Sequence, residues 1–347
     1  MSAEQSKRVA RVLSISGDGV RTAVAAHVLA ELEHRTGQPV HKLFHLIVGE
    51  GAGAVLAMLM ALRSVGGRVL PLGAEAAAIT IEEGLPAFRA PRTWWTQMRD
   101  RVWGESMDQR AQDDLSLTGA DGLLGGADLS SALTDLAIPV FDTANVRPFL
   151  FRSWKAQGLY LRPDEGAGRF EFRGSDIAAA ALRHPLQTEA HTRIRARSRA
   201  EFRLSGGGAL APDPVSLAAL QARHLYRRAN VIQTVSLSFG GRTQQGAVDW
   251  TQAGHRVLSQ ITARGIAEQV LSLSLPSNPA GEPVPARALQ RHMRILSSSF
   301  LANEEFNGFR ALVEEYASQR PLPHTALRTP QEIRTPPRGG FAPVPAS

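Results

Sequence analysis

Residues 43–62 read LFHLIVGEGAGAVLAMLMAL, and they carry the clearest structural pattern in the chain. The apolar run 46–48 is typical of a buried strand, and three alternate glycines follow it, Gly49, Gly51 and Gly53. An Ala/Leu/Met segment then continues to residue 62 without a helix breaker. The stretch therefore predicts a strand, a sharp turn and a buried helix.

The turn Gly49-Glu50-Gly51-Ala52-Gly53 has the spacing of a nucleophile elbow. In the Gly-x-Ser-x-Gly motif of serine hydrolases, a strained strand-to-helix turn exposes the serine hydroxyl at its apex. The outer glycines are needed because strand and helix backbones approach closely. Here the apex residue is Gly51, so the frame of an acyl hydrolase is present without its nucleophile.

A second strand, glycine loop and helix precede this turn. The β-rich run 9–15 leads into Ser16-Gly17-Asp18-Gly19-Val20-Arg21, and apolar residues recur at helical spacing over 23–34. Such a unit can aim backbone N–H groups at an anion, although a strand-to-helix turn needs glycine in any case. It is neither a Walker loop nor a dinucleotide fingerprint. Two such units predict a parallel pair whose glycine loops are neighbours at one sheet edge.

Composition limits the kind of protein. The 347 residues are 43 % hydrophobic and include no Cys, which excludes disulfides, Cys-based zinc sites and thiol nucleophiles. We expect no metal and no cofactor. No N-terminal targeting signal is recognisable, and the most apolar helix, 52–62, is shorter than the ~20 residues that a bilayer requires. These features fit a cytoplasmic protein.

The formal net charge of +7 favours anionic partners, although an arginine-biased genome would give the same charge. Residues 88–103 combine three of the five Trp with four Arg, which suits a membrane interface or a lid over an apolar ligand. A helix packed on the domain is the alternative. Residues 192–203 carry five arginines. They form either a phosphate-binding stripe or a strand and loop exposed to solvent. They are Arg193, Arg195, Arg197, Arg199 and Arg203.

The rest of the chain predicts further elements. Strands are expected at 138–142, 148–154, 202–205 and 231–238. One helix is expected to begin with Ser175 or Asp176 as its N-cap. Further helices are expected from Pro214 to Leu225, over 257–273 and over 289–316. One domain is expected over residues 8–318. Residues 1–7 and the Pro/Arg-rich segment 319–347 are predicted to be disordered. The alternative for 319–347 is a tail that docks on a partner.

Four blocks resemble, in order and spacing, the patatin-like phospholipase family and in particular its bacterial members. LSISGDGVR (13–21) is similar to the family's glycine-rich oxyanion loop, and FHLIVGEGAG (44–53) to its elbow block. DIAAAALRHP (176–185) is similar to an alanine-rich helix of the family, and LSGGGALAPDP (204–214) is similar to its catalytic-acid block. SLSFG (236–240) resembles the strand end that follows, and the match covers roughly residues 8–315.

The resemblance implies a three-layer α/β/α fold with a mainly parallel central sheet, and a Ser–Asp dyad that hydrolyses acyl esters of lipids. Carried over, the nucleophile position is Gly51, and the acid position is Ser205 in the block Ser205-Gly206-Gly207. In the oxyanion loop, Asp18 replaces a glycine and Thr22 replaces the glycine after Arg21. A carboxylate pointing inward there would repel a developing oxyanion.

Three functions are compatible with these residues. The first is a catalytically inactive patatin-like protein that binds a lipid or acyl ligand, regulates or scaffolds. The second is an active acyl hydrolase of lipid metabolism with relocated chemistry, using Ser14, Ser16 or Ser205 with Asp18 as base. The third is a basic interaction protein that contacts anionic membrane through residues 88–103 or binds a protein partner, with nucleic acid the weaker candidate.

Overall fold

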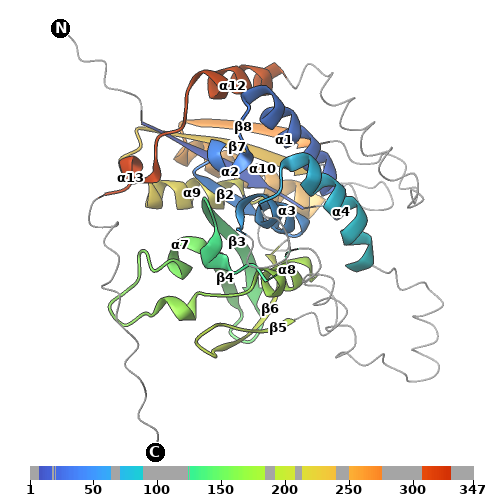
Figure 1. Cartoon of the computed structure of the whole chain (residues 1–347), viewed down its shortest axis with the longest axis vertical. Helices are drawn as coiled ribbons and strands as arrows, with labels where there is room; N and C mark the ends of the chain where they lie inside the picture. Colours follow the sequence, from blue (N-terminus) through green and yellow to red (C-terminus); the bar gives the residue numbers. More distant parts are fainter. Residues whose placement is uncertain are drawn as a thin grey trace, which may run out of the picture.

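The computed structural model describes residues 8–17, 19, 21–63, 71–88, 124, 126–183, 192–207, 213–239, 250–275 and 307–329. Their fold is a mixed α/β arrangement around one sheet (Figure 1). The strands are β1 Val9–Ile15, β2 Leu46–Gly49, β3 Asp135–Asp142, β4 Arg147–Arg152, β5 Thr192–Arg195, β6 Glu201–Gly206, β7 Val231–Phe239 and β8 Gln269–Leu275.

The sheet is mainly parallel at its centre and antiparallel at one end. Its order is β5-β6-β3-β2-β1-β7-β8, with β4 also paired to β3. Strands β3, β2, β1, β7 and β8 run parallel, whereas β4 and β6 are antiparallel to β3 and β5 is antiparallel to β6. Because parallel strands need long crossovers, most of the helices lie between them in sequence.

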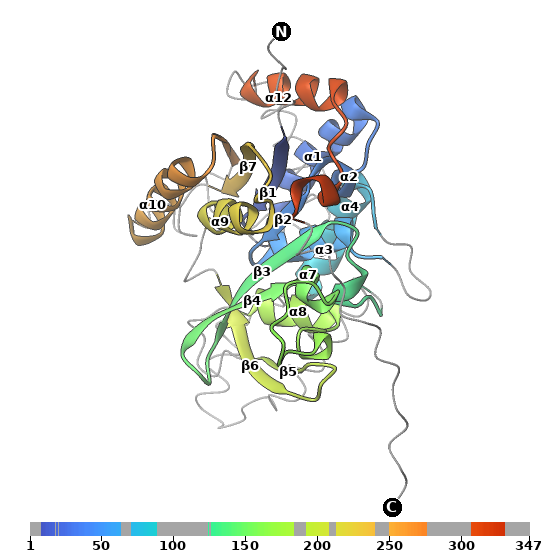
Figure 2. The same cartoon turned by 90° about the vertical axis from the view of Figure 1, so that its left-hand side faces the viewer.

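Helices cover both faces of the sheet (Figure 2). One face packs against α1 Thr22–Thr36, α2 Val40–Leu43, α3 Ala52–Ala61, α4 Ala74–Phe88, α8 Gly174–Leu182 and α12 Asn307–Ser318. The other packs against α9 Val215–Leu225 and α10 Trp250–Ile266. The short elements η1 Leu129–Ser131, α7 Ser153–Ala156, η2 Ala167–Arg169 and α13 His324–Leu327 complete the described fold. The predicted three-layer α/β/α class is confirmed.

The sequence patterns located most strands correctly. The alternation of side chains explains why: Leu13 and Ile15 face one core, whereas Ala10 and Val12 face the other. Helix α4 also includes residues 79–85. The two strands at residues 138–154 form the predicted antiparallel pair around a turn, but the second ends at Arg152 and α7 begins there.

Three expectations were wrong. The helix over 257–273 ends at Ile266, and β8 follows, because the alternating run 269–275 pairs in parallel with β7. Helix α8 begins at Gly174 with Arg173 as N-cap, so neither Ser175 nor Asp176 caps it. Residues 319–329, predicted to be disordered, include α13 and place the buried Arg328 against Asp135 of β3.

Other expectations fall outside the described residues. These are the tails 1–7 and 330–347, the segment 89–103 and the first part of the helix expected over 289–316. The single domain over 8–318 stays a prediction.

Candidate functional site

The turn after β2 has the backbone of a strained elbow with glycine at its apex. Gly51 has φ 56° and ψ −128°, a conformation that L-residues adopt only at a cost. A Cβ built on Gly51 would meet no described atom closer than 3.9 Å. The apex therefore has room for a side chain, although the sequence places none there.

The outer glycines of the elbow are fixed by close backbone contacts. A Cβ on Gly53 would lie 2.4 Å from the carbonyl oxygen of Ile15, and one on Gly49 would lie 2.5 Å from the carbonyl oxygen of Gly53. Both distances are far below any real Cβ contact. Strand β1, strand β2 and helix α3 thus meet so closely that only glycine fits at 49 and 53.

The glycine loop after β1 lies directly against this elbow. A Cβ on Gly17 would lie 2.3 Å from the amide nitrogen of Ala52, the first residue of α3. Gly19 has φ 57°, and its carbonyl accepts a hydrogen bond from Thr22 N–H at 3.1 Å as α1 begins. Arg21 is the N-cap residue of α1, whereas Asp18 and Val20 lie outside the described residues. The two glycine turns are neighbours because their strands are parallel and adjacent.

Strand β6 carries Ser205 to the same region. Strand β4 pairs with β3 from Ala137 to Asp142, so it occupies one edge of β3 along that length. Strands β2 and β6 must then share the other edge. Val48 of β2 pairs with Ala137, and Gly206 of β6 pairs with Val140. These positions lie about 10 Å apart along β3, since a strand rises ~3.3 Å per residue.

Close contacts also fix the glycines after Ser205. The amide of Gly206 donates to the carbonyl of Arg183 at 2.8 Å, and a Cβ there would lie 2.5 Å from that oxygen. A Cβ on Gly207 would lie 2.5 Å from the carbonyl of Pro139. The acid block is therefore held against β3 and the end of α8.

The three serines considered as relocated nucleophiles are all buried. Ser14 lies within β1 and Ser205 within β6. Their hydroxyls make no hydrogen bond to any residue in the described part of the chain. Ser16 directly follows β1, and its hydroxyl donates to the carbonyl of Leu237 at 3.4 Å. None of the three is in contact with a described general base.

Sequence reasoning missed the role of Asp213, a buried carboxylate two residues before α9. Its Oδ1 accepts hydrogen bonds from Ser236 Oγ at 3.2 Å and from Val215 N–H at 3.1 Å, and its Oδ2 accepts one from Gln260 at 3.4 Å. Burial raises the pKa of this carboxyl. The Asp-Pro pair before a helical pattern was the available signal, since a helix start attracts such an acceptor. Asp213 thus fastens the start of α9 to β7.

The described residues hold no group of three or more His, Asp or Glu placed to bind a metal ion. No helix among them is both long enough and apolar enough to cross a bilayer. What the site offers is a strained turn, a helix N-terminus behind it and a glycine loop beside it, which together can face an anionic or carbonyl oxygen.

Comparison with known proteins finds patatin-like relatives. No family model matches the chain. Patatin-like protein 4 of Arabidopsis thaliana is 23% identical over 234 residues, which cover 63% of this chain and 54% of that protein. Probable inactive patatin-like protein 9 of the same plant is 28% identical over 159 residues, 42% of this chain and 39% of that protein.

A search of solved structures finds the type III effector protein ExoU at a TM-score of 0.35 and 12% identity, covering 91% of this chain and 54% of that one. The chain spans about half the length of patatin-like protein 4. These sequence relatives are patatin-like proteins, and they support the resemblance to the patatin-like family that the four blocks carry.

Proposed function

We propose that this chain is a catalytically inactive patatin-like protein that binds a lipid or acyl group at the elbow and the neighbouring glycine loop. One observation carries the proposal. The apex of the elbow keeps the strained backbone of a nucleophile turn, while its residue, Gly51, has no reacting atom. The elbow backbone is present, but the nucleophilic side chain is not.

The second dyad position supports the same conclusion. Ser205 stands where the family resemblance places the acid, and a hydroxyl there cannot take up a proton as a carboxylate does. Removing a nucleophile alone lowers covalent catalysis by several orders of magnitude. Asp18 would in addition place a negative charge in the oxyanion loop. A relative named probable inactive patatin-like protein 9 is consistent with this proposal.

Binding needs less from the site than hydrolysis. The positive end of α3 begins directly at the elbow, and the loop of Gly17 lies against it. Such a pair of backbone segments can hold the carbonyl or carboxylate oxygen of an acyl group. We place the protein in the cytoplasm with peripheral contact to membrane as part of this proposal.

The test is hydrolysis of a soluble short-chain ester by four proteins: the native chain, Gly51→Ser, Gly51→Ser/Ser205→Asp and Gly51→Ala. We expect silence from the native chain and from Gly51→Ala, which adds a side chain without a nucleophile. Activity in the double variant above that of Gly51→Ala would show that only the dyad is missing. Hydrolysis by the native chain above a heat-inactivated sample would overturn the proposal.

The competing function is an active hydrolase that uses Ser14, Ser16 or Ser205 with Asp18. Its one structural support is that the hydroxyls of Ser14 and Ser205 have no described hydrogen-bond partner. A fluorophosphonate probe distinguishes the two functions, because it labels an activated serine covalently. An adduct on one of these serines would favour the active hydrolase, and an unlabelled chain would favour the inactive protein.

A further inference from the structure

The hairpin of β5 and β6 separates its side chains into two faces. Inward, Ile194 and Leu204 are buried, and Phe202 lies in ring contact with Phe149 and Phe172 at centroid distances of 5.1 and 5.5 Å. Outward, the strands and their turn expose one glutamate and five arginines. We call this set the arginine face, and it consists of Arg193, Arg195, Arg197, Arg199, Glu201 and Arg203.

Positive charge on this face is poorly compensated. Arg193 pairs directly with Arg203 across the two strands, an arrangement that is unfavourable for like charges. Glu201 forms an ion pair with Arg195, with both side chains about two-thirds exposed. The hydrogen bond from Arg195 and the charges of Arg195, Arg193 and Arg203 lower the pKa of Glu201. The single carboxylate of Glu201 therefore faces the positive charges of three guanidinium groups.

A second carboxylate near this face, that of Asp142, is engaged in other contacts. Arg193 and Arg203 border a shallow hollow together with Asp142 and Asn145 of the β3–β4 turn. Asp142 is buried, and its oxygens accept hydrogen bonds from the backbone amides of Ala144 and Asn145 and from the Asn145 side chain. Its charge is also paired with Arg147, whose Nε lies 3.6 Å from Asp142 Oδ2, so the five arginines of the arginine face still exceed their one carboxylate, Glu201.

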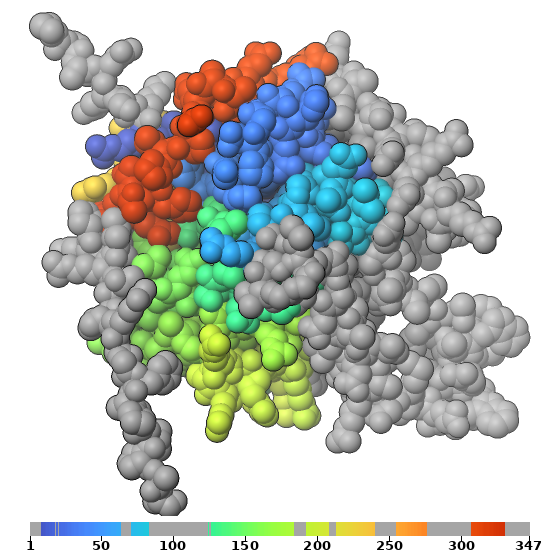
Figure 3. Space-filling view, in the orientation of Figure 1, coloured from blue at the N-terminus to red at the C-terminus, as the bar shows by residue number. Residues whose placement is uncertain are grey.

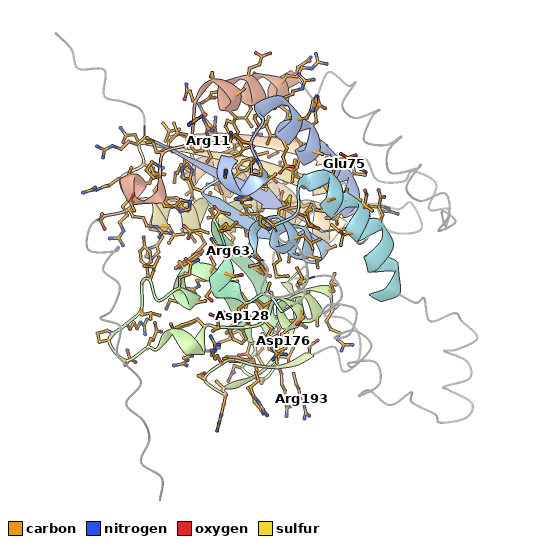
Figure 4. All side chains as sticks on the ribbon, viewed as in Figure 1. Arg11, Arg63, Glu75, Asp128, Asp176 and Arg193 are labelled. Atoms are coloured by element: carbon orange, nitrogen blue, oxygen red, sulfur yellow. The ribbon has the colours of Figure 1, made fainter. Side chains whose placement is uncertain are left out.

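The hairpin projects beyond the sheet edge that holds the elbow. Strand β2 ends at Gly49, while β3 continues to Asp142 and carries β6 along its extension. Figure 3 shows the yellow-green hairpin at the lower rim of the molecule, at the opposite end from α12. In Figure 4, Arg193 lies at this outer end. The arginine face and the elbow thus belong to the same end of the sheet.

We propose that the arginine face docks on the anionic phospholipid headgroups of a bilayer. Bidentate guanidinium groups match phosphate geometry, and several basic side chains on one rigid hairpin add their attractions to a negatively charged surface. The inward aromatic contacts hold the hairpin in place, so its backbone loses little conformational freedom on docking. The idea that docking brings lipid to the elbow rests on the proposed function. The docking proposal itself does not depend on that function.

Charge and composition favour a bilayer over nucleic acid. Single-stranded nucleic acid sites combine basic grooves with aromatic side chains on which bases stack. On this hairpin the one aromatic residue, Phe202, packs inward, and the exposed residues are the arginines, Glu201 and Ser198. The face offers phosphate contacts without a stacking platform.

Co-sedimentation of the full chain with vesicles tests the proposal. One vesicle set is phosphatidylcholine with 30 % phosphatidylserine, and the other is phosphatidylcholine alone. The test variant is Arg193→Gln/Arg203→Gln, and the matched control is Arg310→Gln/Arg320→Gln, which removes two exposed arginines from the opposite end. Circular dichroism checks that each variant is folded, and inorganic phosphate and a labelled oligonucleotide serve as competitors.

We expect native binding to the anionic vesicles only, weakening as salt rises. The test variant should lose about 25-fold in affinity, at roughly fivefold for each arginine, and the control should bind like the native chain. Equal losses in both variants, native-like binding of the test variant, or no vesicle binding would overturn the proposal. So would release by millimolar inorganic phosphate or by the oligonucleotide. Ester hydrolysis plays no part in the readout, so this result and that on the elbow are independent.

Discussion

Gly51 faces Gly17 across the elbow: a Cβ built on Gly51 would lie 3.9 Å from both the Cα and the carbonyl oxygen of Gly17. This is ordinary van der Waals contact, and it contrasts with Gly53, where a Cβ would lie 2.4 Å from the carbonyl of Ile15. Glycine is therefore favoured at these two positions of one turn for different physical reasons. At Gly51 the reason is the strained φ, and at Gly53 it is the close approach of the neighbouring backbone.

Gly51→Ser should fold, at a cost of about 1–3 kcal/mol from the strained backbone. Gly53→Ser should cost far more, because α3 would have to move away from β1. Urea unfolding monitored by circular dichroism measures both. Similar midpoints for the two variants would contradict the geometry of the elbow.

Ser205→Ala should change the free energy of unfolding by no more than about 0.5 kcal/mol, because the buried hydroxyl has no described partner to lose. The matched control is Ser153→Ala, since Ser153 is equally buried and its Oγ accepts the Leu136 N–H at 2.8 Å. That change should cost about 1–3 kcal/mol. Chemical denaturation of both variants provides the comparison, and a larger loss at Ser205 would reveal a contact there.

Stability should fall as the pH drops from 6.5 towards 4 because of His45. Burial, reinforced by the charge of His324, lowers the pKa of His45 to about 4. Its Nδ1 accepts the Arg11 N–H at 2.9 Å and its Nε2 lies 2.8 Å from the Leu322 carbonyl, which fixes the neutral tautomer with the proton on Nε2. The unfolded chain takes up the proton first, so acid favours unfolding by up to about 3 kcal/mol.

The measurement is the unfolding midpoint at pH 7.5, 6, 5 and 4.5, for the native chain and for His45→Gln. The variant will be less stable at pH 7.5, but its stability should depend less on pH. Parallel curves for the two proteins would show that another group is responsible.

The C-terminal segment is held on the sheet by a buried ion pair. Asp135 accepts hydrogen bonds from Arg328 and, at 2.5 Å, from the Tyr226 hydroxyl. Burial alone would raise the pKa of Asp135, but His324 and Arg328 hold it well below its usual range. Stability from this carboxylate is therefore present above about pH 4 and is lost only in stronger acid.

Arg328→Met should cost about 3–5 kcal/mol at neutral pH, because it leaves the Asp135 carboxylate buried without its main cation. Arg195→Met, which breaks the exposed pair with Glu201, should cost at most about 1 kcal/mol. Thermal or urea unfolding measures both. Equal costs would mean that the buried Arg328–Asp135 pair contributes no more to stability than an exposed ion pair.

The sequence by itself determined the centre of the molecule. The glycines at 49, 51 and 53, the apolar runs before them and the helix after them predicted β2, the elbow and α3, because each pattern is local and has one stable geometry. The same holds for β1, α1 and the parallel pairing that makes the two glycine loops neighbours. The absence of a nucleophile at residue 51 was also readable from the sequence alone.

Only the tertiary structure decided the rest, because it depends on residues far apart in the chain. The run 269–275 becomes β8 since β7 offers it an edge to pair with, which overrides the helical pattern before it. Arg328 becomes ordered because Asp135, nearly two hundred positions away, is buried beneath it. The arginines of β5 and β6 form one face because pairing places Arg193 opposite Arg203. Long-range pairing and burial leave no period in the sequence from which they could be predicted.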